Sequence, residues 1–118
     1  MFGPVAVLTE TGLKNGYHEM DLGLTGKVAI VTGGSDGIGK AAAISLAREG
    51  ASVAIVGRTQ AKLDAAVAEI EAETGGEVIG VPTDVSVESD VQVMVAKVVD
   101  RFGGIDILVN NAGTSSAT

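Results

Sequence analysis

Four short runs of aliphatic and β-branched residues recur along the chain, and a stretch of helix length separates each run from the next. The runs are 27–32 (KVAIVT), 52–56 (SVAIV), 77–81 (EVIGV) and 105–109 (IDILV). Continuous apolar runs of this length are typical of strands buried on both faces of a parallel sheet. The intervening stretches carry apolar residues at helical spacing, such as Leu63, Val67 and Ile70, and end at glycines. This alternation predicts an α/β fold of right-handed βαβ units, with about four strands and three helices.

The beginning of the chain departs from this alternation. Residues 1–19 hold no sustained helical or strand period and are rich in turn formers, which predicts a loop. Met20 then opens MDLGLTGKVAIVTGG, which has the pattern of a natural start. We therefore predict an irregular arm over 1–23, with Met20 as the true first residue, and a domain over 24–118. The alternative is a genuine arm that packs against a partner subunit.

No helical pattern follows the run 105–109 to cover that strand. A parallel sheet needs both of its faces and both of its edges protected. We therefore expect a domain that is truncated after its fourth strand. Ile105, Ile107 and Val109 would then meet water or a second molecule, which predicts poor solubility or dimerisation of the isolated chain.

Composition excludes several classes of function. The net charge of −7 repels phosphate backbones, so non-specific nucleic-acid binding is not expected. The chain has no cysteine, which removes disulfides, thiolate chemistry and cysteine-ligated zinc, and we predict no metal site. The single histidine, His18, is assigned to the arm and not to a ligand set. No apolar run is long enough to span a membrane and no signal peptide is evident, so we expect a soluble, cytoplasmic protein.

The stretch 32–41 (TGGSDGIGKA) admits two phosphate-binding interpretations. From Gly34 it runs G-x-x-x-x-G-K-A, one residue short of the loop of nucleotide triphosphatases, which requires a hydroxyl where Ala41 stands. From Gly33 it runs G-x-x-x-G-x-G, a spacing that suits a dinucleotide pyrophosphate. In that interpretation Gly33 permits the sharp exit from the strand, Gly37 lets the pyrophosphate approach the backbone, and Gly39 lets the helix pack closely on the sheet. The dinucleotide interpretation is favoured.

Three motifs together resemble the short-chain dehydrogenase/reductase family. They are TGGSDGIG at 32–39, Asp84-Val85 after the third run and NNAG at 110–113 after the fourth. The resemblance covers about 24–118 and implies the N-terminal, cofactor-binding part of a Rossmann-like domain, less than half of a full-length member.

The resemblance implies a role for each motif residue. Backbone groups around Ser35, Gly37 and Ile38 would hold the pyrophosphate, and Thr32 would brace the loop against Asn110 or its neighbours. Asp84 would accept a hydrogen bond from the adenine amino group, with Val85 against the ring. The residues that would line the ribose are Asn110, Ala112 and Gly113. Asn110 and Asn111 also have a purely structural interpretation, since paired asparagines often satisfy loose backbone groups at a strand end.

Residues after the second run bear on the choice between NADP(H) and NAD(H). A carboxylate near this point would hydrogen-bond the ribose 2′-hydroxyl of NAD, and Gly57 has no side chain to do so. Arg58 can instead clamp a 2′-phosphate. Asp36 argues the other way, because a carboxylate there would repel that phosphate if it pointed inward. We favour NADP(H), with NAD(H) as the alternative.

The family transfers hydride between a nicotinamide cofactor and a small alcohol or carbonyl substrate, with a catalytic tyrosine and a lysine four residues later. The only tyrosine is Tyr17, and Asp21 stands where that lysine would be. We therefore predict no catalytic residue in this chain, which would bind cofactor but be inactive alone, and a homo-oligomer for the complete protein. The alternatives are a stand-alone or split nucleotide-binding module and, less favoured because of Ala41, a nucleotide hydrolase.

Overall fold

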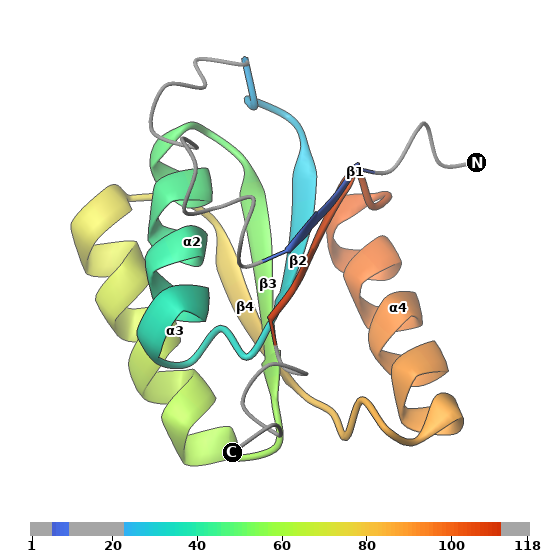
Figure 1. The fold of residues 1–118 in the computed structure, drawn as a ribbon. Helices are drawn as coiled ribbons and strands as arrows, with labels where there is room; N and C mark the ends of the chain where they lie inside the picture. Colours follow the sequence, from blue (N-terminus) through green and yellow to red (C-terminus); the bar gives the residue numbers. More distant parts are fainter. Residues whose placement is uncertain (1–5, 10–22, 112–118) are drawn as a thin grey trace.

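The computed structural model describes residues 6–9, as backbone, and 23–111. In chain order the elements are β1 (Ala6–Thr9), β2 (Val28–Thr32), α2 (Gly37–Arg48), β3 (Ser52–Gly57), α3 (Gln60–Thr74), β4 (Val78–Pro82), α4 (Glu88–Phe102) and β5 (Ile107–Asn110). The strands form one sheet in the order β1-β5-β2-β3-β4, and every neighbouring pair is parallel (Figure 1). The predicted α/β fold with a Rossmann-like parallel sheet is therefore confirmed.

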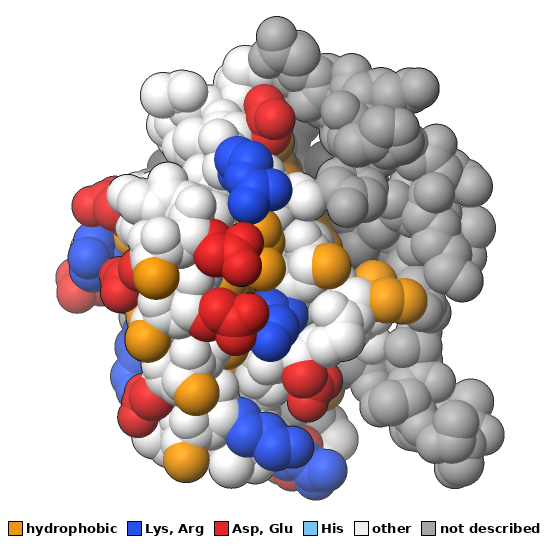
Figure 2. All heavy atoms as spheres, turned by 90° about the vertical axis from the view of Figure 1, so that its left-hand side faces the viewer, with side chains coloured by type: hydrophobic (Ala, Val, Ile, Leu, Met, Phe, Trp, Pro, Cys, Tyr) orange, Lys and Arg blue, Asp and Glu red, His pale blue; other side chains and the backbone are white. Residues whose placement is uncertain are grey.

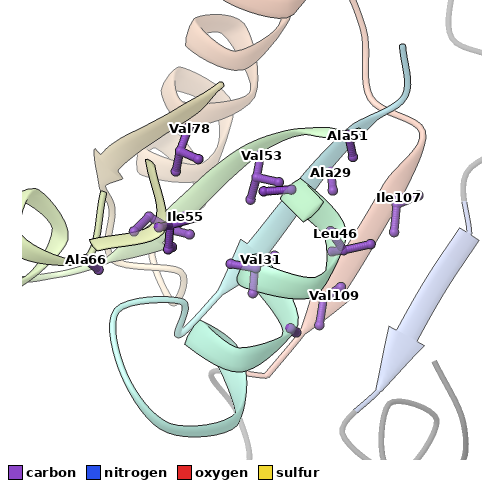
Figure 3. Close-up of a cluster of buried hydrophobic side chains, with 14 of the residues drawn as sticks. Ala29, Val31, Leu46, Ala51, Val53, Ile55, Ala66, Val78, Ile107 and Val109 are labelled. Atoms are coloured by element: carbon purple, nitrogen blue, oxygen red, sulfur yellow. The ribbon is translucent and has the colours of Figure 1, made fainter. Parts of the chain in front are cut away.

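Helices cover both faces of the sheet. Helices α2 and α3 lie on one face and α4 lies on the other (Figure 1). Successive strand residues point to opposite faces, so each strand contributes to two separate cores. The α2/α3 side buries Ala29, Val31, Val53, Ile55 and Val109 (Figure 3). The α4 side buries Val28, Ile30, Ala54 and Val56 against Met94 and Val98. This two-sided burial explains why the strands read as continuous apolar runs and not as alternating ones.

Glycines end the helices as the sequence predicted. Gly75 and Gly103 adopt left-handed φ angles of 69° and 92° directly after α3 and α4, and each N–H closes the last helical turn. Gly50 follows α2 with a φ of 99°. These turns return the chain to the amino end of the next strand, so every βαβ unit points the same way. None of the helices between residues 23 and 111 is long and apolar enough to cross a membrane.

Strand β1 was not predicted. Ala6–Thr9 pairs in parallel with β5, with Ala6 opposite Ile107 and Thr9 opposite Asn110. The expectation of a wholly irregular arm is therefore wrong over these four residues, whereas 10–22, including Tyr17, His18 and Met20, lies outside the described residues. A run of four residues is too short for a strand period to be recognised against its turn-rich surroundings.

The expected exposure of the fourth predicted strand is also wrong. Ile105, Ile107 and Val109 are only 9%, 8% and 0% exposed. Ile107 and Val109 belong to the core under α2 and α3, and Ile105 belongs to the core under α4. Because β1 also occupies the outer edge of β5, the backbone groups on that edge have a partner and the basis for predicting poor solubility is removed.

The pairing of β1 with β5 is testable by proline substitution. Successive N–H groups of a strand point to opposite sides, so only one of Val7 and Leu8 donates toward β5. We expect one of Val7→Pro and Leu8→Pro to lower the free energy of unfolding by about 1 kcal/mol more than the other, because it loses a ladder hydrogen bond. Urea denaturation of both variants measures the difference. Equal stabilities, both matching the unchanged chain, would contradict the pairing.

Candidate functional site

The carboxyl ends of β2, β3, β4 and β5 meet along one edge of the sheet, at the bottom in Figure 1. The chain proceeds outward from β2 to β3 and β4, and then crosses back so that β5 lies on the other side of β2. The strand order therefore reverses between β2 and β5. In open parallel sheets ligands bind outside the carboxyl ends of the strands at this kind of reversal. All of the motif residues that the structure describes lie on this edge.

The glycine loop between β2 and α2 makes a sharp turn. Gly33 and Gly37 have φ angles of 67° and 59°, which side chains rarely adopt, and the Gly33 N–H donates to the Val56 carbonyl at 2.8 Å. Asp36 occupies the N-cap of α2, but its side chain makes no capping hydrogen bond. The first N–H groups of a helix have no partner within it. In this helix they are left available to a ligand's oxygens, beside the exposed Gly37 and the half-buried Ile38.

Gly39 fixes how closely α2 approaches the loop. A Cβ built at this position would lie 2.0 Å from the Gly33 carbonyl oxygen and 2.9 Å from the Asn111 side-chain nitrogen. No residue with a side chain fits there. The first turn of α2 can therefore pack against the Gly33 carbonyl only because position 39 is glycine. Close approach here is what the sequence assigned to Gly39.

Thr32 joins the ends of β2 and β5. Its hydroxyl is buried and donates toward the Val109 carbonyl and the Asn110 Oδ1, each at 3.3 Å. The same hydroxyl accepts from the Asn111 N–H at 2.8 Å. The predicted brace between Thr32 and Asn110 is therefore present. Asn111 had only a structural interpretation from sequence, that of satisfying loose backbone groups at the strand end. Its N–H donates to the Thr32 hydroxyl, and its side-chain nitrogen lies beside Gly39.

Asp84 lies in a tight turn after β4. Its Oδ1 accepts from the Ser86 hydroxyl at 2.6 Å and from the Ser86 N–H at 3.0 Å. These bonds, with a smaller contribution from Arg58, lower the pKa of Asp84 below its usual value. The carboxylate is thus ionised at neutral pH and can only accept hydrogen bonds. Val85 next to it is 45% exposed, and Val87 two residues later is 41% exposed, so this turn presents apolar side chains to solvent.

The end of β3 lies between the glycine loop after β2 and the turn after β4. The Gly57 carbonyl accepts from the Thr83 N–H at 2.7 Å. A Cβ at Gly57 would lie 3.6 Å from Leu63 and 3.9 Å from the Ser35 hydroxyl, which is ordinary contact, so Gly57 leaves a small space beside Ser35. Arg58 is exposed, and its charge reaches Asp84.

The structure thus gathers most of the predicted residues at one edge. Those placed there are Gly33, Ser35, Gly37, Ile38, Gly39, Arg58, Asp84, Val85 and Asn110. Ala112 and Gly113 lie outside the described residues. Among the residues that the structure describes, no group of acidic and histidine side chains is arranged to hold a metal ion.

Comparisons with known proteins agree with this arrangement. The profile of the family described as short chain dehydrogenase matches residues 27–118. The short-chain dehydrogenase/reductase homolog YusS of Bacillus subtilis is 47% identical over 87 residues, which cover 73% of this chain and 79% of that protein.

Solved structures show the same likeness. L-sorbose reductase from Gluconobacter frateurii, in complex with NADPH and L-sorbose, superposes with a TM-score of 0.76 and 45% identity, covering 80% of this chain and 36% of that one. Hydroxysteroid dehydrogenase from Escherichia coli gives a TM-score of 0.73 and 36% identity, covering 77% of this chain and 38% of that one. The chain thus spans a little over a third of these two proteins.

The Thr32 hydroxyl provides a direct test of how the edge is held together. Thr32→Val keeps the shape of the side chain but leaves the Asn111 N–H without its acceptor and removes the donor to β5. We expect the free energy of unfolding to fall by about 1–3 kcal/mol, measured by urea denaturation. Thr32→Ser, which keeps the hydroxyl, is the matched control and should lose less. If Thr32→Val were as stable as the unchanged chain while Thr32→Ser lost stability, the methyl group and not the hydrogen bonds would be responsible.

Proposed function

Because the chain belongs to the short-chain dehydrogenase family, we propose that residues 24–118 form the cofactor-binding part of an oxidoreductase. The complete protein would transfer hydride between NADP(H) and a small alcohol or carbonyl substrate. The observation that carries this proposal is the glycine turn at the strand reversal, where Gly39 brings the start of α2 directly beneath the Gly33 carbonyl. When bound, the nicotinamide supplies the hydride chemistry, and the residues of this chain hold and orient it.

The pyrophosphate is proposed to bind over the start of α2. Backbone N–H groups at a helix N-terminus, together with the positive end of the helix dipole, favour phosphate. Asp36 leaves these groups without a side-chain cap, and the first turn of α2 contains no acidic residue. Gly33 and Gly37 allow phosphate oxygens to reach the backbone, and Ser35 and Ile38 complete the loop.

The adenine is proposed to lie at the end of β4. The ionised Asp84 can accept a hydrogen bond from the adenine amino group, and the exposed Val85 offers an apolar surface for the ring. Ser86 donates two hydrogen bonds to Asp84 Oδ1 and thereby fixes the carboxylate. Asn110 at the end of β5, with Ala112 and Gly113 beyond it, is proposed to line the ribose nearer the nicotinamide.

The preference for NADP(H) is proposed to depend on Arg58 and Gly57. Gly57 supplies no carboxylate for a 2′-hydroxyl, and the space beside it borders the Ser35 hydroxyl. Arg58 is exposed at the same strand end and can give a charge-assisted hydrogen bond to a 2′-phosphate. The relative solved with NADPH, the Gluconobacter frateurii reductase, is 45% identical to this chain.

The proton chemistry of the reaction is not assigned to this chain. Tyr17 is followed at position 21 by aspartate, so no Tyr-x-x-x-Lys is present to supply a general acid. We propose that this chain by itself binds cofactor without turnover. The complete protein is further proposed to be a cytoplasmic homo-oligomer.

A stand-alone or split nucleotide-binding module is the second candidate. One observation favours it: the match to the Bacillus subtilis homolog covers 79% of that protein, in contrast to 36% of the Gluconobacter frateurii reductase. A relative of comparable length is consistent with a short chain that binds a nucleotide without catalysis. Cofactor affinity together with a companion chain that carries Tyr-x-x-x-Lys would support the split form.

Ligand titration of the purified chain tests the proposal. We expect saturable binding of NADPH, weaker binding of NADH and no binding of ATP with magnesium, each measured by calorimetry or cofactor fluorescence.

Arg58→Gln should weaken the affinity for NADPH by about tenfold or more and leave the affinity for NADH unchanged, because the variant loses a charge-assisted contact to the 2′-phosphate. Arg101→Gln is the control, because it removes the same positive charge from α4, where Arg101 lies over the ring of Phe102. Magnesium-dependent ATP binding would instead revive the nucleotide hydrolase.

A further inference from the structure

Three ion pairs join α2 or its N-cap to α3. Asp36 pairs with Lys62 at 3.9 Å, Lys40 with Glu69 at 3.0 Å, and Arg48 with Glu73 at 3.3 Å. Figure 2 faces this side of the molecule and shows acidic and basic side chains interspersed over the helices. In the two pairs farther from the glycine loop the α2 partner is basic. At the loop end the polarity is reversed, so that α2 presents the carboxylate and α3 presents the ammonium group.

The reversed pair lies where the phosphates of the cofactor are proposed to bind. Asp36 immediately precedes Gly37, and Lys62 lies in the first turn of α3, four positions after Arg58. Both side chains of the pair are mostly exposed, 74% for Asp36 and 66% for Lys62. Neither side chain therefore packs in the core, and an ion pair this exposed contributes little to the free energy of unfolding.

Asp36 creates an electrostatic difficulty for a phosphorylated cofactor. A carboxylate next to the glycine loop repels any phosphate bound near the ends of β2 and β3, and most of all a dianionic 2′-phosphate. Lys62 lies within ion-pair distance of that carboxylate and carries the opposite charge. Its ammonium group can hold the Asp36 side chain toward α3 and reduce the negative potential at the loop.

We propose that Lys62 is a positioning residue that sets cofactor preference by offsetting the charge of Asp36. Arg58 contacts the 2′-phosphate, and Lys62 permits that contact by acting on Asp36. This inference rests on the proposed function. It explains how a chain with an acidic residue in its glycine loop can still favour the phosphorylated ribose.

The test compares adenosine 2′,5′-bisphosphate with adenosine 5′-monophosphate, which differ only by the 2′-phosphate. Calorimetry gives the ratio of the two dissociation constants for the unchanged chain, Lys62→Gln, Asp36→Asn and the double variant. We expect Lys62→Gln to reduce the preference for the bisphosphate by about two- to fivefold, the range typical of an exposed ion pair. In the Asp36→Asn background the same change should have little further effect, because the charge that Lys62 offsets is already gone.

Arg48→Gln is the matched control. It removes one positive charge from the same pair of helices and breaks an exposed ion pair with Glu73, but at the end away from the loop. We expect it to leave the ratio unchanged. Thermal unfolding of all variants checks that the fold is retained, which is expected because each altered side chain is largely exposed.

Two results would overturn the inference while leaving the proposed function intact. One is an unchanged ratio in Lys62→Gln. The other is an equal loss with and without Asp36, which would make Lys62 a direct phosphate ligand. If the unchanged chain bound neither nucleotide nor NADPH, the proposed function itself would fail, and this inference with it. The two failures are distinguished by the titration of the unchanged chain alone.

Discussion

The parallel pairing of β2 with β3 on one side and β5 on the other is the constraint on which the rest of the structure depends. It places β2 at the centre of the sheet and buries all five of its residues. It also brings the ends of β2 and β5 together, although they are 77 or more positions apart in the chain. The glycine turn, the Thr32 hydroxyl and the two asparagines meet only because these strands are neighbours. The site is thus a consequence of strand order more than of any one motif.

Small residues let α2 pack closely against the strand ends that this order brings together. Gly39 permits the approach of α2 to the turn, and the buried alanines of α2, Ala42, Ala43 and Ala47, let the helix lie close to the sheet. The first N–H groups of α2 are consequently held at a fixed position relative to the strand ends. Phosphate binding by backbone groups requires this kind of fixed geometry, because no flexible side chain can correct an error in it.

Most of the fold could be predicted from sequence because its signals are local. The apolar runs, the helical spacing of Leu63, Val67 and Ile70, and the terminating glycines each depend on neighbouring residues only. Strand β1 could not be found in this way, since its four residues are a strand only because β5 offers them an edge. The reversed ion pair of Asp36 and Lys62 was also missed. It depends on the distance between two elements, which no spacing along the chain reveals.

The pairing of β1 with β5 has a consequence for the order in which the protein is made. Ala6 lies opposite Ile107, so β1 cannot pair until β5, about 100 residues later in the chain, has been synthesised. At a synthesis rate of about 5–20 residues per second, this delay amounts to roughly 5–20 seconds. During that interval β2, β3 and β4 can assemble with α2 and α3, since their contacts are closer in sequence. Pairing of β1 therefore follows the assembly of these strands, and nascent chains halted before β5 would carry β1 without its strand partner.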